Sequence, residues 1–339
     1  MHRCLQLAKL GAGNVAPNPL VGAVLVYENE IIGEGYHQQY GQAHAEVNCI
    51  NNVSDANQSL IEKSTLYVSL EPCAHFGKTP PCADLIIKHK IPNVVVACRD
   101  SDEEVDGKGI QKLQQAGVNV KVDILEKEAL ELNKRFFTFH IKQRPYIILK
   151  WAQSGDAKIA RQDFSAGKIS NDITNRLVHK WRGEEAAILV GTNTALYDNP
   201  SLTTRLWKGN NPVRLVIDLQ LKLPISLHLF DEAVKTIVFN QVKDEEENGV
   251  TFYKLPSGED IIPGLLNALY QLKIQSVLVE GGARLLQSFI NQHYWDEARV
   301  ITNEQLTIES GINAPELKNS SLESINKTTG DQVAFYRPG

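Results

Sequence analysis

A chain of 339 residues exceeds the usual size of one hydrophobic core, so the length predicts two domains. Hydrophobic residues make up 42% and charged residues 22%, which is typical of a soluble globular protein, and no apolar run reaches the roughly 18 residues that a membrane helix needs. The net charge of −5, from 35 basic and 40 acidic side chains, excludes a general attraction to nucleic acid.

The amino terminus and the cysteines indicate the compartment. The segment MHRCLQLAKLGAGNVAPNPLVG has neither a continuous apolar stretch nor a small-residue cleavage site, so it is not typical of a signal peptide. The 5 cysteines are odd in number and sparse, unlike the dense pattern of a secreted disulfide scaffold. We therefore expect a cytoplasmic protein whose cysteines are reduced or bind a metal.

Short β-branched runs alternate with helical segments over the first 125 residues. Strands are predicted at 20–27, 65–70 and 93–98, and helices at 45–53, 82–89 and 108–116. This alternation predicts an α/β sheet with helices on its faces. An apolar series with helical spacing then runs from Leu125 to Phe139, and Pro145 discourages its continuation. We place the domain boundary near residue 143, which predicts domains at 1–143 and 144–339.

A second α/β pattern follows this boundary. Strands are predicted within YIILKW (146–151), AAILVG (186–191), VRLVID (213–218), KTIVFN (235–240) and SVLVE (276–280), and helices at 171–181 and 261–272. The segment KDEEENG (243–249) is predicted to be a charged loop. These elements predict a second sheet with its own core.

The segments HAEVNCI (44–50) and PCAHFGKTPPC (72–82) carry the residues of a metal site. His44 can offer a neutral imidazole and Cys73 and Cys82 can offer thiolates, a set suited to Zn²⁺ with a fourth position left for water. Zinc lowers the pKa of such a water toward about 7, and Glu46 is placed to exchange a proton with it. H-x-E followed by P-C and a second cysteine is the pattern of zinc-dependent base deaminases. The motif predicts hydrolytic removal of an amino group from a heterocycle.

Each part of this motif alone is weak evidence, because H-x-E is common by chance and an isolated cysteine is more often a small buried hydrophobic residue. The combination is more specific, since it follows a predicted strand and Cys82 opens a predicted helix, whose positive end stabilises a thiolate. A closed structural zinc site is the alternative, with His75 as a candidate fourth ligand. We expect His75 to contact the substrate instead.

The segments NPLVGAVLV, GEGYHQQYGQAHAEVNCI and EPCAHFGKTPPCADLII resemble the deaminase half of the bifunctional riboflavin-biosynthesis deaminase/reductase family. The His-x-Gly-x-Thr-Pro-Pro insert distinguishes this family from the tight P-C-x-x-C of cytidine, deoxycytidylate and tRNA-adenosine deaminases. The resemblance implies a cytidine-deaminase-like three-layer α/β/α domain followed by a dihydrofolate-reductase-like α/β domain. It also implies removal of the 2-amino group from a 2,5-diamino-6-(5-phosphoribosylamino)pyrimidinone. The substrate contacts that it implies are Asn18, His37, His75 and Lys78.

The segment SVLVEGGARLLQSFI (276–290) predicts a strand, a Gly-Gly turn and a helix whose first amides favour phosphate. No G-x-G-x-x-G follows a strand, so a Rossmann site is not predicted. By resemblance, this segment and LVGTNTALYDNPSLTTR (189–205) belong to an NADPH-dependent reductase that converts the ribosyl group to ribityl. The residues implied for NADPH are Ala152, Thr194, Asp198, Gly282, Ala283, Arg284, Leu285, Leu286, Gln287 and Ser288, and those implied for the ribosyl phosphate substrate are Arg182, Leu202, Arg205 and Glu280.

The chain departs from the family pattern at one cofactor position. Lys168, in SAGKIS, stands where the family often has a tryptophan stacked beside the cofactor, and we assign it to the cofactor site. Lys150 and Asp156 flank the expected cofactor strand and are candidates to orient the sugar hydroxyls or supply a proton. The departure leaves open a monofunctional zinc deaminase with an inactive second domain, beside the structural zinc module. The resemblance further implies a homo-oligomer with a small-molecule substrate and no nucleic-acid or membrane partner.

Overall fold

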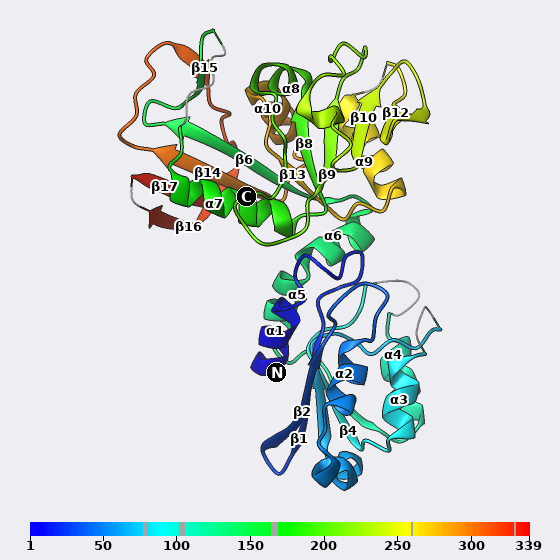
Figure 1. Ribbon diagram of the computed structural model, residues 1–339. Helices are drawn as coiled ribbons and strands as arrows, with labels where there is room; N and C mark the ends of the chain where they lie inside the picture. Colours follow the sequence, from blue (N-terminus) through cyan, green and yellow to red (C-terminus); the bar gives the residue numbers. More distant parts are fainter. Residues whose placement is uncertain (77–79, 102–105, 164–168, 259, 329) are drawn as a thin grey trace. The chain divides into compact units, whose positions relative to one another are not determined.

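The computed structural model describes residues 1–76, 80–101, 106–163, 169–258, 260–328 and 330–339. The chain divides into two compact units, Met1–Gln143 and Arg144–Gly339, each built around its own sheet (Figure 1). Lys78 and Lys168 lie outside the described residues. Among the described helices, none combines the length and the apolar character that crossing a bilayer requires.

The first unit contains a five-stranded sheet in the order β2-β1-β3-β4-β5. Strand β1 pairs antiparallel with β2 and β3, whereas β3, β4 and β5 run parallel. Strands β3, β4 and β5 can run parallel because helices connect them. A tight hairpin can join only antiparallel strands. The strands are β1 (Gly22–Tyr27), β2 (Glu30–Tyr36), β3 (Thr65–Val68), β4 (Asn93–Val96) and β5 (Asn119–Lys121).

Helices cover both faces of this sheet (Figure 1). On one face, Ala23 and Leu25 pack with α2 (Ala45–Asn51), α3 (Cys82–Lys88) and α4 (Lys108–Gln115). On the other face, Val24 packs against α1 (His2–Lys9), because successive strand side chains point to opposite sides. A 3₁₀ helix, η1 (Asp55–Lys63), precedes β3. The predicted three-layer α/β/α arrangement is confirmed.

The predicted continuous helix from Leu125 to Phe139 was wrong, because two helices, α5 (Glu126–Leu132) and α6 (Lys134–Lys142), occupy this region. Asn133 separates them. Its side-chain amide accepts a hydrogen bond from the Leu20 N–H at 2.7 Å and donates one to the Leu20 carbonyl at 2.9 Å. An asparagine amide can satisfy a backbone segment in this way, so Asn133 anchors the junction of the two helices to a distant loop.

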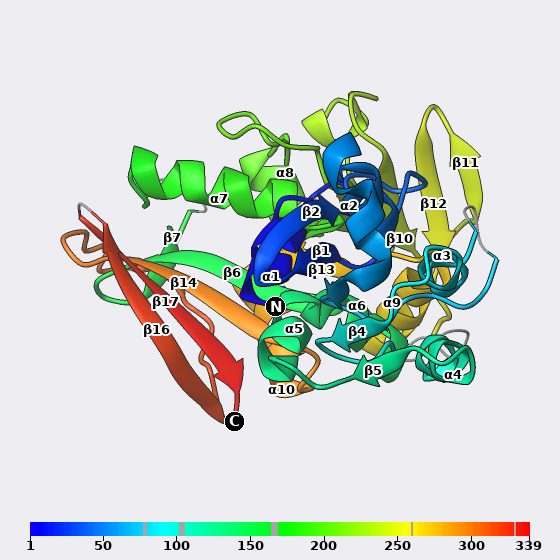
Figure 2. The ribbon, with the colours of Figure 1, turned by 90° about the horizontal axis from the view of Figure 1, so that it is seen from below.

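The second unit contains a ten-stranded sheet in the order β11-β12-β10-β9-β8-β13-β6-β14-β17-β16. From β12 to β14 in this spatial order, each pair of neighbouring strands is parallel. The strands on either side of this stretch are antiparallel to it. Figure 2 shows β6, β14, β17 and β16 side by side at one end. The strands are β6 (Tyr146–Ser154), β8 (Ala187–Gly191), β9 (Val213–Ile217), β10 (Thr236–Asn240), β11 (Glu245–Glu247), β12 (Val250–Lys254), β13 (Ser276–Val279), β14 (Glu297–Asn303), β16 (Ser320–Thr328) and β17 (Asp331–Pro338).

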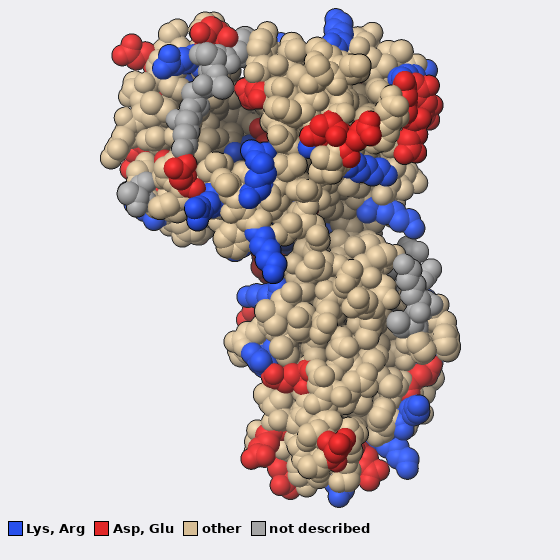
Figure 3. Space-filling model, in the orientation of Figure 1, with Lys and Arg blue, Asp and Glu red and all other residues tan. Residues whose placement is uncertain are grey.

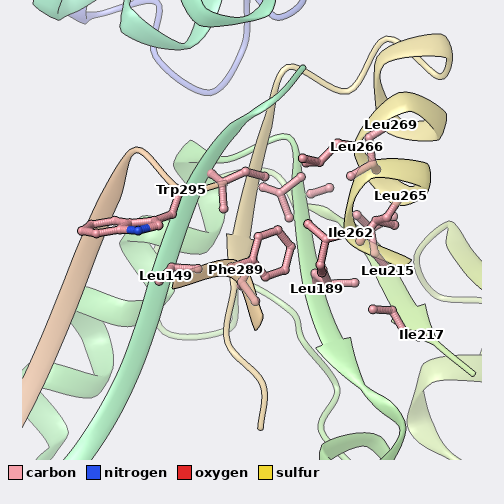
Figure 4. Packing of buried hydrophobic residues seen from close by; sticks show 14 of the residues in the cluster. Leu149, Leu189, Leu215, Ile217, Ile262, Leu265, Leu266, Leu269, Phe289 and Trp295 are labelled. Carbon is pink, nitrogen blue, oxygen red and sulfur yellow. The ribbon is translucent and has the colours of Figure 1, made fainter. Parts of the chain in front are cut away.

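The main core of the second unit lies between this sheet and two helices, α9 (Ile261–Gln271) and α10 (Ala283–Asn291). Figure 4 shows Leu265 and Leu269 of α9 and Phe289 of α10 pointing toward strand residues such as Leu189. Helices α7 (Asp172–Glu184) and α8 (Thr192–Asp198) pack on the opposite face. The remaining elements are η2 (His228–Phe230) and a small sheet of β7 (Lys158–Arg161) with β15 (Gly311–Asn313).

The predicted charged loop at 243–249 was wrong in part, because Glu245–Glu247 form the edge strand β11. It pairs antiparallel with β12 through a tight turn at Asn248 and Gly249, whose φ angles are 49° and 71°. Asn-Gly suits a two-residue turn with positive φ at both positions. The exposed glutamates contribute to the acidic surface near β12 in Figure 3, and like charges of this kind protect a sheet edge from pairing.

Candidate active sites

Helix α2 places a histidine and a glutamate in the first unit's cavity. His44 is the residue that caps the amino end of α2, and Glu46 lies in the first turn, where its side chain is 3% exposed. The Asn48 amide donates to the Tyr36 carbonyl at 2.8 Å, which attaches the start of α2 to β2. The position of both functional side chains therefore depends on how closely this helix approaches the sheet.

That approach requires glycine at position 35. A Cβ atom on Gly35 would lie 2.2 Å from the Cys49 backbone nitrogen, so α2 would have to move. We expect Gly35→Ala to lower the free energy of unfolding of the first unit by about 2 kcal/mol and to weaken zinc retention, measured as metal per chain after dialysis against a chelator. Gly264→Ala in α9 is the control, because a Cβ atom there would lie 4.0 Å from its nearest neighbour, the Pro256 side chain. Zinc retention equal to that of the unsubstituted protein would contradict the expectation.

The two cysteines reach the same point from a loop and a helix. Cys73 follows β3 and Cys82 is the first residue of α3, as predicted. The Cys82 N–H donates to the Cys73 sulfur at 3.3 Å. The His44 Nδ1 atom lies 3.3 Å from the Cys82 sulfur and 3.7 Å from the Cys73 sulfur, and the three ligand atoms lie within 4.8 Å of one another. Tetrahedral zinc bonds to sulfur and nitrogen imply a separation of roughly 3.6 Å, so the donor set fits Zn²⁺.

The electrostatics of this cluster favour a bound cation. A hydrogen bond from Cys82 is the main cause that lowers the pKa of the Cys73 thiol to about 4. Burial, followed by the charge of Cys73, raises the pKa of the Glu46 carboxyl to about 7. A dication between these groups counters the accumulated negative charge. The Glu46 carboxyl is thus buried beside the ligand atoms, where it can reach a water bound to such a cation.

Glu71 is a structural support that the sequence analysis missed. Its carboxylate accepts hydrogen bonds from the backbone N–H groups of Gly109 and Ile110, at 2.9 and 3.1 Å, and from that of Gly107 at 3.1 Å. These donors surround the amino end of α4, where unpaired amides favour a carboxylate. Glu71 lies two residues before Cys73, so it holds the ligand loop on α4. The sequence did contain a signal for this residue, because Glu71 begins the E-P-C segment that contains the predicted ligand Cys73.

A cavity of about 250 Å³ opens beside the metal set. His44, Glu46 and Cys73 line it. Among the predicted substrate contacts, Asn18, His37 and His75 also line this cavity, so the structure brings them together with the metal set. Burial lowers the pKa of His37, whose ring is 3% exposed. Additional lining residues that were not predicted include Tyr40, Gln42, Asp100 and Phe136.

The second unit has a cavity of about 670 Å³ at the carboxyl ends of β6, β8 and β13. Ligands of parallel α/β sheets bind at this edge, and the volume suits a cofactor-sized molecule. Gln287, Ser288, Arg182, Leu202 and Arg205 are not among its lining residues. The predicted residues that line it are Ala152, Thr194, Asp198, Glu280, Gly282, Ala283, Arg284, Leu285 and Leu286.

The glycine pair before α10 shapes the floor of this cavity. A Cβ atom on Gly281 would lie 2.9 Å from the Val190 Cα atom, so β8 and the turn can meet only without a side chain there. Gly282 has a φ of 67° and borders Thr194. This backbone cradle leaves the first amides of α10 next to the cavity, where they suit a phosphate group. The residues present therefore fit a dinucleotide cofactor.

A buried ionic group lies directly before the glycine pair and also lines the cavity. Arg182 donates two hydrogen bonds to the Glu280 carboxylate, at 2.8 and 2.7 Å, and the Lys150 Nζ atom lies 3.7 Å from the same carboxylate. Burial by itself raises the pKa of Glu280, but the charges of Arg182 and Lys150 outweigh it and hold the pKa at about 2. Because its guanidinium already grips a carboxylate, Arg182 is less available for phosphate than the sequence suggested.

Side chains hold the segment 201–205 from several directions. Arg214, which is fully buried, donates to the Ser201 carbonyl at 2.9 Å, and Arg182 donates to the Thr203 carbonyl at 3.3 Å. The His179 Nδ1 atom accepts the Arg205 N–H at 2.9 Å. Leu202, between these anchors, is buried with a φ of 50°. The anchors keep this strained segment in one conformation and leave the Arg205 side chain exposed.

His179 makes the second unit sensitive to acid. Burial, followed by the charges of Arg182 and Arg205, lowers the pKa of His179 to about 4. The unfolded chain, with an ordinary histidine pKa near 6.5, binds more protons between these values, so stability falls as the pH drops from about 6.5 to about 4. We expect His179→Phe to flatten this slope in urea unfolding.

Tryptophan fluorescence measures this slope, because the 4 tryptophans all lie in the second unit. His228→Gln, at an exposed histidine of the same unit, is the control and keeps the slope of the unsubstituted protein. An unchanged slope in His179→Phe would show that other groups cause the acid sensitivity.

Asp156 lies outside the cavity lining. It accepts hydrogen bonds from Ser154 at 2.6 Å and from the backbone N–H groups of Ile308 and Glu309, at 3.1 and 2.8 Å. The hydrogen bond from Ser154 is the largest of the effects that lower its pKa to about 2. Asp156 therefore joins two loops, and Lys150 is the one of the two predicted sugar-orienting residues that reaches the cavity.

A three-layer unit with an open histidine-cysteine metal set, followed by a unit with a dinucleotide-sized cavity, defines a zinc deaminase joined to a reductase. Residues 1–98 match the model of the cytidine and deoxycytidylate deaminase zinc-binding region, and residues 145–304 match that of the RibD C-terminal domain. The riboflavin biosynthesis protein RibD of Aquifex aeolicus is 39% identical over 98% of this chain and 94% of its own length. The chain belongs to the RibD family of riboflavin biosynthesis enzymes.

Solved structures agree with this assignment. One is the diaminohydroxyphosphoribosylaminopyrimidine deaminase/5-amino-6-(5-phosphoribosylamino)uracil reductase of Thermotoga maritima. Its TM-score is 0.91 at 34% sequence identity, and the match covers 100% of this chain and 97% of that chain. Acinetobacter baumannii RibD has the same TM-score at 30% identity and the same coverage. The predicted family, fold class and two-step activity with Zn²⁺ and NADPH are confirmed, and neither alternative is favoured.

Proposed function

We propose that residues 1–143 deaminate 2,5-diamino-6-(5-phosphoribosylamino)pyrimidin-4(3H)-one to 5-amino-6-(5-phosphoribosylamino)uracil, with His44, Cys73 and Cys82 as the zinc ligands. The observation that supports this best is the set of sulfur–nitrogen separations of 3.3 and 3.7 Å beside the buried Glu46. Zn²⁺, when bound, supplies Lewis-acid activation of water. The Glu46 carboxylate takes a proton from the attacking water and delivers it to the leaving amine.

Residues 144–339 then reduce the ribosyl group of this product to ribityl with a hydride from NADPH. The amino end of α10 and the Gly281–Gly282 turn hold a phosphate of the cofactor. Glu280, kept ionised by Arg182 and Lys150, accepts hydrogen bonds from the sugar hydroxyls. Arg205, whose side chain is exposed and whose backbone N–H binds His179, binds the substrate phosphate. The sequence suggested both Arg182 and Arg205 for this phosphate, and the assignment keeps Arg205 because Arg182 already binds Glu280.

Two assays on one preparation test these roles. The zinc-loaded protein should release ammonia from the diaminopyrimidinone without NADPH, and the deaminated product should then cause NADPH absorbance to fall. Ammonia release without NADPH oxidation would support a deaminase with an inactive second domain. Absence of both reactions in zinc-loaded, folded protein would overturn the proposal.

We propose two further properties. The enzyme works in the cytoplasm on a small-molecule substrate, as its few cysteines suggest, and it forms a homo-oligomer, as the family resemblance implies. Light scattering on the purified protein measures the number of chains in the assembly. A molar mass equal to that of one 37.7 kDa chain would contradict the second property.

A further inference from the structure

Two side chains on the wall of the deaminase cavity form a short hydrogen-bonded relay. The His37 Nδ1 atom lies 3.0 Å from the Ala43 carbonyl oxygen, and its Nε2 atom lies 3.1 Å from the Asn18 side-chain nitrogen. The His37 ring meets the ring of His44 edge to face, with centroids 5.5 Å apart. Asn18 is therefore separated from a metal ligand by one imidazole. Both Asn18 and His37 line the same cavity as Glu46.

The chemistry of the partners decides the protonation of this ring. A carbonyl oxygen can only accept a hydrogen bond, so the proton of the imidazole must be on Nδ1, facing Ala43. The atom that faces Nε2 is the Asn18 side-chain nitrogen, which can only donate a hydrogen bond, so a proton on Nε2 would set two donors against each other. The His37 Nε2 atom is then a lone-pair acceptor. Two acceptors cannot share a hydrogen bond, so Asn18 must offer its NH₂ group to His37.

This orientation leaves the Asn18 carbonyl oxygen turned away from His37. Among the residues that the structure describes, His37 is the one hydrogen-bond partner of the Asn18 side chain. Because Asn18 lines the cavity, the oxygen is an acceptor available to a ligand there. The deamination changes one substituent of the pyrimidine from an amino group, which donates hydrogen bonds, to a carbonyl, which only accepts them. A fixed acceptor on the wall distinguishes these two states.

We propose that His37 is a positioning residue that holds the Asn18 amide with its oxygen toward the pyrimidine in the cavity, so that the cavity binds the amino substrate and disfavours the carbonyl product. This inference rests on the proposed deaminase function. When the site sets an acceptor against an acceptor, a buried polar atom is left without a hydrogen bond. Such a mismatch is the most effective way to discriminate between two ligands. The lock therefore favours product release from the first site.

The test compares the substrate KM with the product inhibition constant in ammonia release, without NADPH so that the product is not consumed. His37→Phe keeps an aromatic ring but removes the acceptor, so the Asn18 amide is free to turn and donate to the product carbonyl. We expect the ratio of product inhibition constant to substrate KM to fall about tenfold, the value of one hydrogen bond of about 1.4 kcal/mol. His37→Gln, which can place an amide oxygen near the position of Nε2, restores most of the ratio.

A double-variant cycle shows whether His37 acts through Asn18. Asn18→Ala alone should remove the discrimination, and adding His37→Phe to it should change the ratio by less than about twofold. Equal effects of His37→Phe in both backgrounds, or an unchanged ratio in the single variant, would overturn the inference. Zinc content and NADPH oxidation with the deaminated product verify the folding of both units. If the unsubstituted, zinc-loaded protein released no ammonia, the proposed function itself would fail, which is a different outcome.

Discussion

Glu46→Gln should reduce ammonia release by about 10³-fold or more while zinc stays bound. The glutamine has nearly the same shape but cannot take the proton of the attacking water or return it to the leaving amine, and proton transfer of this kind contributes about 10²–10⁴-fold. The ligand atoms of His44, Cys73 and Cys82 are untouched, so metal analysis should give the same zinc content per chain. The reductase reaction on the deaminated product should also be unchanged, since Glu46 lies in the first unit.

Asp84→Asn is the matched control for this variant. Asp84 is a carboxylate of α3 in the same unit, and its side chain is 42% exposed in an ion pair with Lys112. Exposed pairs contribute little, so we expect activity within about twofold of the unsubstituted protein. Full activity of Glu46→Gln would remove Glu46 from the mechanism. Loss of zinc together with activity would instead indicate a role for Glu46 in holding the ligand set.

Glu280→Gln should disable and destabilise the second unit. The carboxylate compensates Arg182 and Lys150, whose side chains are each 13% exposed, and removing one partner leaves buried charge without compensation. The expected loss is about 3–5 kcal/mol of unfolding free energy, measured by tryptophan fluorescence in urea. NADPH oxidation should also fall, because the acceptor that we propose for the sugar hydroxyls is lost. Ammonia release should persist.

Glu184→Gln tests the same change at a surface position of the second unit. Glu184 pairs with Lys180 at 3.7 Å across one turn of α7, and both side chains are at least 32% exposed. We expect a change below about 0.5 kcal/mol. A similarly small change in Glu280→Gln would show that Arg182 and Lys150 find other compensation, and it would argue against Glu280 as the anchor of the ionic group.

The structure brings the residues predicted for the deaminase site together more completely than those predicted for the reductase site, and the reason is physical. His44, Cys73 and Cys82 are rare residue types whose chemistry is specific, so three of them in a short interval indicate a metal even without coordinates. The reductase cavity is built from common residues such as Ala152 and Leu285, whose placement depends on strand order. For those residues only the family resemblance was available.

Contacts between residues far apart in the chain were also missed. Asn133 separates the two helices found in place of the one predicted over 125–139, and its amide pairs with Leu20, more than a hundred residues earlier in the chain. Glu280 was predicted as a substrate contact, but its pairing with Arg182 bridges two elements that are 98 residues apart. Periodicity within a window of residues contains no information on such contacts.

The sequence by itself determined the fold class, the metal chemistry and the alternation of strands and helices, because these depend on residue type and local spacing. The tertiary structure decided which side chains share a cavity: it placed Glu71 on the end of α4, Asn18 on His37 and Arg182 on Glu280. These contacts arise only when the sheets bring separate segments together, and the burial that accompanies them sets hydrogen-bond direction and charge.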